Sequence, residues 1–204
     1  MGRRETNKAD KLRRIEGAGL AIFLRDGYAV ASVEDIAASA DVARGTFYLY
    51  FKNKEVLFAH LVARAFVPLQ GAIHAAQAAL SAEPGREEAS IAYAALSLGL
   101  ASVVAEHREP LRLVFAEARS AGAGGELVRR EIAVIEELVQ GVLDDAVNRG
   151  ILRAHQSRAV ALAIVGGIEK LTWHYLEGDP SIDVSTLAAE MTGLFRHGLA
   201  PHAP

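Results

Sequence analysis

With 204 residues, of which 51% are hydrophobic, 23% charged and 6% aromatic, the chain has the composition of a mostly helical protein of one or two domains. It contains no Cys, which excludes disulfides and thiolate metal sites, and no apolar run approaches the roughly 20 residues that span a bilayer. The net charge of −3 divides unevenly: residues 1–60 carry 10 Lys and Arg against 8 Asp and Glu, and the remainder carries 12 against 17.

The first 14 residues hold six basic side chains against two acidic ones. A basic segment ahead of a near-neutral domain could contact the phosphates of a nucleic acid, and a solvated terminus without a partner fits the charge equally well. No apolar stretch of the signal-peptide kind follows this segment, so we expect a cytoplasmic protein with no membrane partner.

Apolar residues recur at helical spacing along the whole chain, and no alternating segment of useful length predicts a strand. A first helix is predicted over residues 8–25 and ends at Gly27, since glycine is the usual left-handed terminator. Ser32 and Asp35 form the S-x-x-D pattern of a capping box, which predicts a short helix over Val33–Ser39.

A second short helix is predicted from about Ala43 to Phe51, and Asn53 is placed to cap a further helix that starts at Lys54. Pro68 is expected to kink or end that helix, because proline has no backbone N–H and clashes with the preceding turn. The later helices are predicted to reach residue 81 and then to cover residues 87–106, a stretch opened near Pro110, and residues 126–149, 157–177 and 184–199.

Two short helices that follow a longer one match the geometry of a helix-turn-helix. Phe47 and Phe51, one helical turn apart, are predicted to point back into a small core. A helix exposed in this way fits the major groove of DNA, where Arg can donate a bidentate pair to guanine and Gly lets the backbone approach closely. Five residues are then available at its outward surface: Arg44, Gly45, Thr46, Tyr48 and Leu49.

Phosphate contacts are expected beside this surface. Tyr48, Tyr50 and the Lys54 ammonium suit phosphate oxygens, and the helix that starts at Lys54 adds its own amide dipoles. The alternative is an ordinary three-helix cap whose surface Arg and Tyr have no DNA partner, since short helical hairpins are common.

The run SVEDIAASADVARGTFYLYFKNKE over residues 32–55 resembles the DNA-binding segment of the TetR (tetracycline-repressor-like) family, and GTFYLYFKNKE is highly specific to that family. FLRDGYAVAS before it resembles the end of the family's first helix, and residues 173–199 are similar to the last two helices of many members. The strong resemblance covers about residues 8–60, and beyond them it is architectural. It implies an all-α protein of about nine or ten helices, with a helix-turn-helix domain over residues 1–60 and a larger helical effector-binding and dimerisation domain over 61–204.

Residue by residue, the resemblance implies that Arg44 and Gly45 contact base edges of double-stranded DNA, and that Ser32 caps its helix against a phosphate. It implies contacts with phosphate or the groove wall from four others: Tyr48, Leu49, Tyr50 and Lys54.

Two positions depart from the family pattern. Asp41 stands where the family usually has Gly in the turn, and Asp tolerates left-handed backbone better than most residues. Ala43 replaces the frequent Ser or Thr cap of the recognition helix, which would leave Asp41 or water to satisfy its first amides.

The second domain carries two apolar stripes at helical spacing on its long helices. Each stripe could face the core of its own chain, which the residues alone favour, while the resemblance implies a homodimer. A twofold dimer would place two recognition helices about 34–36 Å apart and require a near-palindromic operator. The predicted interface residues are Val128, Ile132, Ile135, Val139, Val142, Ile164, Ile168, Leu171 and Tyr175.

The resemblance also implies a small effector, apolar or aromatic, held between helices of the second domain. Each aromatic candidate could equally be core packing. The predicted pocket residues are Phe66, Tyr93, Leu96, Leu100, Phe115 and Trp173, with His107 or His174 as polar anchors.

We therefore expect a ligand-responsive DNA-binding regulator, most simply a repressor, with no cofactor and no metal. A helical protein-interaction module is the alternative. An enzyme is a weaker one, because the chain contains no HExxH, Walker or GxSxG motif, and the glycines near Gly122 follow no strand and lack a dinucleotide-loop pattern.

Overall fold

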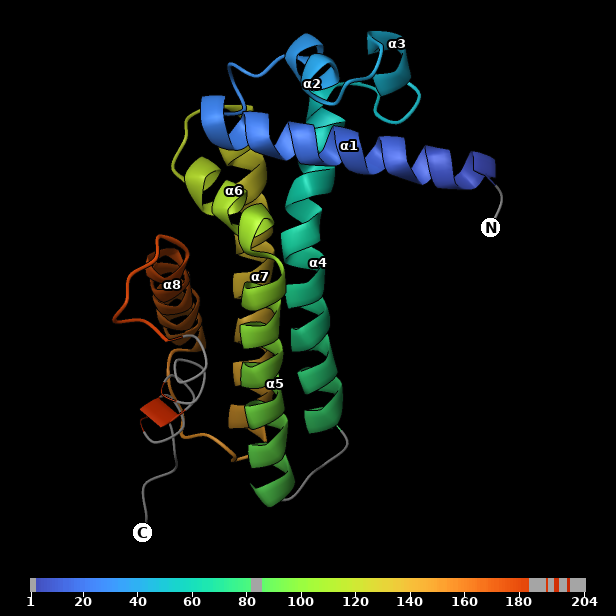
Figure 1. The fold of residues 1–204 in the computed structure, drawn as a ribbon. Coiled ribbons are helices and arrows are strands. Elements are labelled where there is room, and N and C mark those ends of the chain that lie inside the picture. Colours follow the sequence, from blue (N-terminus) through green and yellow to red (C-terminus); the bar gives the residue numbers. More distant parts are fainter. Residues whose placement is uncertain (1–2, 82–85, 184–189, 191–192, 195–197, 199–204) are drawn as a thin grey trace. The chain divides into compact units, whose positions relative to one another are not determined.

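The computed structural model describes residues 3–81, 86–183, 190, 193–194 and 198, and all the regular secondary structure in this part of the chain is helical, which confirms the all-α prediction (Figure 1). The helix predicted over residues 184–199 falls largely outside the described residues. The eight helices that the structure describes are α1 (Arg3–Asp26), α2 (Val33–Ser39), α3 (Arg44–Phe47), α4 (Lys54–Ser81), α5 (Arg86–Glu106), α6 (Arg108–Ala118), α7 (Ala123–Asn148) and α8 (Ser157–Leu176).

Local start and stop signals account for several helix ends. The Ser32 hydroxyl accepts a hydrogen bond from the Asp35 amide at 3.1 Å, so α2 starts where the capping box predicts. The Asn53 side chain accepts from the Val56 amide at 3.0 Å and caps α4. Gly27 has a φ of +79°, the left-handed geometry expected of a helix terminator.

Several helices differ from their predicted bounds, α1 and α4 among them. Helix α1 begins at Arg3, five residues before its predicted start. Helix α4 continues through Pro68 to Ser81, so of the two predicted effects of this proline, a kink or an end, the end is wrong and the kink stays a prediction. The proline costs one backbone hydrogen bond, but apolar side chains on either side of it, among them Phe66 and Ile73, are buried and stabilise the helix through packing.

The chain forms two compact units. Unit 1 comprises residues 1–65 and 109–130, and unit 2 comprises residues 66–108 and 131–204. A simple division after residue 60 therefore does not describe the packing, because α6 from Glu109 onward and the start of α7, up to Arg130, join the N-terminal helices. The assignment of DNA binding to residues 1–60, and of effector binding and dimerisation to residues 61–204, remains a prediction.

The core of unit 1 is built from α1, α2, α3 and α4. Its largest fully buried side chains include Phe23, Phe47 and Phe58, and the Phe23 and Phe58 rings meet edge to face with centroids 5.2 Å apart. At Gly19 a Cβ atom would lie 2.6 Å from Cδ2 of Leu57, so α1 and α4 cross closely and a larger residue would require the Leu57 side chain to shift. The packing of α1 on α4 forms part of the core that holds the helix-turn-helix.

Unit 2 has a core cluster made by α7, α8 and the segment between them. Leu143 and Ala146 from α7 pack with Leu152 and with Ala161 from α8. The apolar stripes predicted on these two helices therefore serve, in part, the core of their own chain.

Helix α4 is long and apolar enough, by length and composition, to cross a membrane, whereas the sequence analysis expected no such segment. Its buried positions, however, contribute to helical packing, including the fully buried Leu57, Leu61 and Val62. A core helix of a helical protein passes the same test, and we assign α4 to the core.

Candidate DNA-binding surface

The turn between α2 and α3 sets the direction of the recognition helix. Asp41 lies in this turn with a φ of +50°, the left-handed conformation in which the family pattern has glycine. The α-helical geometry of α3 covers only Arg44–Phe47, and hydrogen-bonded turns continue it to Phe51. Ala43 makes no side-chain capping bond, and the Asp41 carboxylate pairs with Arg14.

Helix α3 has one buried and one exposed face, as its sequence predicts. Phe47 is fully buried and Phe51 is 6% exposed, so both side chains anchor the helix in the core. On the other face Leu49 is 80% exposed and Tyr48 is 45% exposed. An exposed leucine is suited to the methyl groups of bases in the major groove.

Arg44 lies on this exposed face and is held by two neighbours. Its Nη1 lies 2.7 Å from Oε1 of Glu34 on α2, and its Nη2 lies 3.4 Å from the Tyr48 hydroxyl. The guanidinium carbon is 5.8 Å from the centre of the Tyr48 ring. The hydrogen bond with Tyr48, and then the charge of Glu34, raise the pKa of Arg44 above its usual value, so the side chain stays cationic.

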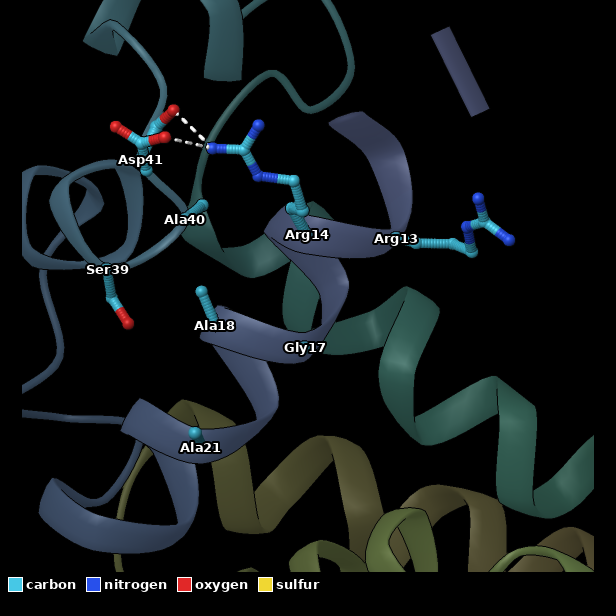
Figure 2. A pocket seen from close by; sticks show the side chains of 8 residues that line it. All are labelled: Arg13, Arg14, Gly17, Ala18, Ala21, Ser39, Ala40 and Asp41. Carbon is cyan, nitrogen blue, oxygen red and sulfur yellow. Dashed lines mark hydrogen bonds and ion pairs between the residues drawn. The ribbon is translucent and has the colours of Figure 1, made fainter. Parts of the chain in front are cut away.

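A second arginine ties the turn to α1. Nη2 of Arg14 donates to the carbonyl oxygen of Asp41 at 2.6 Å and to its carboxylate at 2.7 Å, as Figure 2 shows. The two residues border an open hollow of about 410 Å³ between α1 and the end of α2, which Ser39 and Ala40 also line. Because the guanidinium reaches across this hollow, its visible role is to fix the turn against α1.

The phosphate candidates have different surroundings. Tyr50 is half-buried and its hydroxyl donates to the carbonyl oxygen of Lys8 at 3.1 Å, which ties α1 to the segment after α3. The hydroxyl of Ser32, at the start of α2, lies 2.5 Å from the Asp35 carboxylate. Thr46 is half-buried and Gly45 is exposed.

The contacts of Lys54 differ most from its predicted role as a phosphate contact. Its Nζ donates to three backbone carbonyl oxygens, those of Tyr28, Ala29 and Ala31, at 2.9, 3.1 and 2.8 Å. The same ammonium lies 4.9 Å from the centre of the Tyr28 ring. All its donors point into the segment between α1 and α2, so the geometry favours a structural clamp over the predicted phosphate contact.

A buried carboxylate holds the same segment from α6. Glu117 is only 5% exposed, and it accepts from the Tyr28 amide at 2.7 Å and from the Ser120 hydroxyl at 2.5 Å. Gly124, at the start of α7, lies so close to the Tyr28 ring that a Cβ atom there would be 2.9 Å away. Sequence reasoning missed Glu117, because nothing in its local pattern separates it from a surface glutamate.

The predicted effector-binding residues are spread over several elements. The structure does not describe the side chain of Tyr93, and Phe115 belongs to unit 1 while the other candidates belong to unit 2. His174 pairs with Asp179, Nδ1 to Oδ2, at 3.1 Å. Phe66 is buried, and the remaining candidates are half-buried: Leu96, Leu100, His107 and Trp173. A shared pocket for these residues remains a prediction.

The predicted dimer residues fall into three groups. Three are buried within one protomer and offer little surface to a partner: Val128, Ile135 and Val142. Val139 and Ile164 pack against the unit 2 core cluster, and the Tyr175 ring lies beneath the Arg108 guanidinium at 4.6 Å. The remaining candidates are half-buried: Ile132, Ile168 and Leu171.

Residues 16–61 match the model of a family described as bacterial regulatory proteins, tetR family. A segment of 68 residues is 35% identical to the HTH-type transcriptional repressor DhaR of Mycobacterium sp. (strain GP1), and it covers 33% of this chain and 34% of that protein. Residues 16–61 carry the DNA-binding segment of the TetR family. The fatty acid metabolism regulator protein of Bacillus subtilis (strain 168) is 46% identical over 48 residues, which are 24% of this chain and 25% of that protein. The matched segments thus span about a third and a quarter of the length of these curated relatives.

Solved structures extend the similarity of fold beyond the segment that matches the TetR family. A Clostridium perfringens protein described as a candidate fatty acid metabolism regulator has a TM-score of 0.77 at 20% identity, covering 93% of this chain and 100% of that one. SmeT, the repressor of the Stenotrophomonas maltophilia efflux pump SmeDEF, has a TM-score of 0.72 at 17% identity, covering 94% and 91%. FadR from Bacillus subtilis, in complex with stearoyl-CoA, has a TM-score of 0.68 at 21% identity, covering 92% and 99%.

Proposed function

We propose that this chain is a ligand-responsive transcriptional repressor of the cytoplasm. It binds a near-palindromic operator as a homodimer, and a small apolar effector changes its affinity for DNA. The observation that carries the proposal is that α3 and the turns after it have one buried and one exposed face. Phe47 is buried, whereas Arg44, Tyr48 and Leu49 are exposed to solvent. A surface with this chemistry on a short helix suits the major groove.

The dimer part of the proposal rests on symmetry and on the family. A single short helix reads only a few base pairs, whereas two copies spaced by one turn of DNA read two half-sites. The half-buried Ile168 and Leu171 on α8 are the candidate contacts with the second copy.

The effector part rests on the apolar character of the predicted pocket residues. The solved FadR of Bacillus subtilis holds stearoyl-CoA, and two of the relatives above are named for fatty acid metabolism. A long-chain acyl-CoA is therefore the first compound to test. Its expected action is a population shift, in which the effector binds more tightly to a dimer geometry that no longer matches successive grooves.

The experiment that tests the proposal starts from a random-sequence selection with the purified full chain. Fluorescence anisotropy then compares the selected duplex with a scrambled one at two salt concentrations. The proposal expects tight, sequence-dependent binding that weakens steeply as salt rises, because cations released from the phosphates drive binding. No enrichment, or salt-insensitive binding without sequence preference, would contradict DNA recognition and favour a protein-interaction module.

The variant Arg44→Ala tests whether the exposed face of α3 contacts the bases. If Arg44 contacts a base edge, the variant relaxes preference at one operator position and costs about 1–3 kcal/mol there. Anisotropy with duplexes altered at single positions measures this. Arg13→Ala, at an exposed arginine on α1 away from α3, is the control and should keep the preference at every position. An unchanged preference in Arg44→Ala would place the DNA surface elsewhere.

A further inference from the structure

Helix α2 carries two acidic residues in its first turn, and they have different partners. The Asp35 carboxylate lies 2.5 Å from the Ser32 hydroxyl, and so it belongs to the cap of α2. The Glu34 carboxylate instead lies 2.7 Å from Nη1 of Arg44, ten residues along the chain and on the next helix. Capping therefore accounts for one carboxylate and leaves the other unexplained.

The Glu34–Arg44 pair contributes little to folding. Both side chains are more than half exposed, 54% and 61%, and ion pairs this exposed stabilise proteins weakly because water screens them. What the pair does is restrict a long side chain. Glu34 holds the guanidinium from α2, and Tyr48 lies against it one turn further along α3.

The contact atoms matter for what Arg44 can still bind. Glu34 takes Nη1, and the only other close neighbour that the described residues give the guanidinium, the Tyr48 hydroxyl, is at 3.4 Å, the limit of a hydrogen bond. The edge formed by Nε and Nη2 is the one that the carboxylate leaves free. Two parallel N–H groups on one edge are the donor pattern that guanine O6 and N7 accept.

We propose that Glu34 is a positioning residue for base recognition, which holds Arg44 by Nη1 so that its other edge is presented to guanine. This inference rests on the proposed function. The carboxylate restricts the arginine before DNA arrives, so less side-chain freedom is lost when the complex forms. Glu34 also repels phosphates, so a carboxylate beside a DNA-binding surface favours selectivity over affinity.

The test compares Glu34→Ala with Asp35→Asn in the full chain. Both changes remove one negative charge from the same turn of α2, but only the first removes a partner of Arg44. We expect Glu34→Ala to bind the selected operator about three- to tenfold more weakly than Asp35→Asn, with the loss confined to the guanine position that Arg44 reads. Binding to scrambled duplex should be the same in the two variants.

Two further variants complete the test. Glu34→Gln keeps an oxygen that can accept from Nη1 and should restore part of the lost affinity. In an Arg44→Ala background, Glu34→Ala should add no further loss, because the two residues act through one contact. Thermal unfolding followed by circular dichroism checks that each variant is folded.

Three results would overturn the inference. Operator binding by Glu34→Ala as tight as by Asp35→Asn, or tighter, would mean that Glu34 restrains Arg44 without aiding recognition. An equal loss on operator and scrambled duplex would indicate general damage to the surface. An undiminished loss in the Arg44→Ala background would exclude the contact. If the parent binds no duplex selectively, the proposed function fails and the inference falls with it.

Discussion

Lys52 and Lys54 are two residues apart, yet their side chains meet different surroundings. Lys52 is exposed, whereas the ammonium of Lys54 donates to three backbone carbonyl oxygens between α1 and α2. The residue type alone suggests phosphate binding for both. The contacts separate them, because an ammonium whose three protons already have acceptors must break those bonds before it can bind a phosphate.

Lys54→Met should lower the free energy of unfolding by about 2 kcal/mol, because it removes the charged donor from three carbonyl groups. Urea unfolding measures this change. Lys52→Met is the matched control, and its effect on stability should stay within about 0.5 kcal/mol. If Lys54→Met were instead stable and lowered the salt slope of DNA binding by about 0.9, Lys54 would be a phosphate contact.

Asp41 combines a left-handed backbone with a side chain that pairs with Arg14. Asp41→Ala should lose the pair and raise the backbone strain, lowering the free energy of unfolding by about 1–2 kcal/mol. Asp41→Gly also loses the pair but accepts the backbone without strain, so it should stay within about 1 kcal/mol of the parent. Equal losses in the two variants, measured by urea unfolding, would show that the backbone conformation has no energetic role.

Between α1 and α2 the chain is held by side chains from two later helices. Lys54 at the start of α4 binds its carbonyl groups, and Glu117 from α6 accepts its Tyr28 amide. The Tyr28 ring, 8% exposed, packs on Phe58 with centroids 4.7 Å apart. This segment has no regular secondary structure. It is held by polar contacts with residues that are 23 to 89 positions away in the sequence.

Burial, followed by the charge and hydrogen bond of Glu55 and the charge of Glu117, raises the pKa of Tyr28 to about 12. A phenol in the unfolded chain titrates near pH 10, so its folded-state pKa is the higher one. The protonated Tyr28 phenol contributes about 2–3 kcal/mol to the free energy of unfolding. This contribution is complete below about pH 10 and is lost as the pH rises from there through about 12. Urea unfolding at several pH values should therefore show a smaller alkaline loss for Tyr28→Phe than for the parent. Parallel curves would show that the Tyr28 phenol does not contribute.

Over the whole molecule, the features that could be predicted from the sequence are those that depend on residues close to one another along the chain. The bounds of α2 follow from the Ser32–Asp35 cap, and the buried face of α3 follows from the spacing of two phenylalanines. Arg14, Arg44 and Lys54 pair with Asp41, Glu34 and the Tyr28 carbonyl oxygen, which lie 10 to 27 residues away, and pairing at such distances depends on how helices cross. The uninterrupted α4 was missed because tertiary packing outweighs the local cost of a proline.

The proposed homodimer leads to a prediction for α8. Ile168→Arg places a charge on the half-buried face that we assign to the partner, so it should shift the protein to monomers and weaken operator binding. Analytical ultracentrifugation measures the first effect and anisotropy the second. Ala105→Arg, on an exposed position of α5, introduces the same charge away from α8 and should leave the dimer intact. An unchanged dimer in Ile168→Arg would exclude this face.

Helix α4 passes from unit 1 to unit 2 between Ala65 and Phe66, and Pro68 lies within a turn of that boundary. Because Pro68 has no N–H to donate to the carbonyl oxygen of Arg64, the hydrogen-bond ladder has one bond fewer there. Cooperative unfolding spreads along a helix through such bonds, so the junction is a natural border between two units that exchange their amide protons with water independently. The residue expected to kink or end the helix thus lies within it, and we expect it to separate the stability of the two halves.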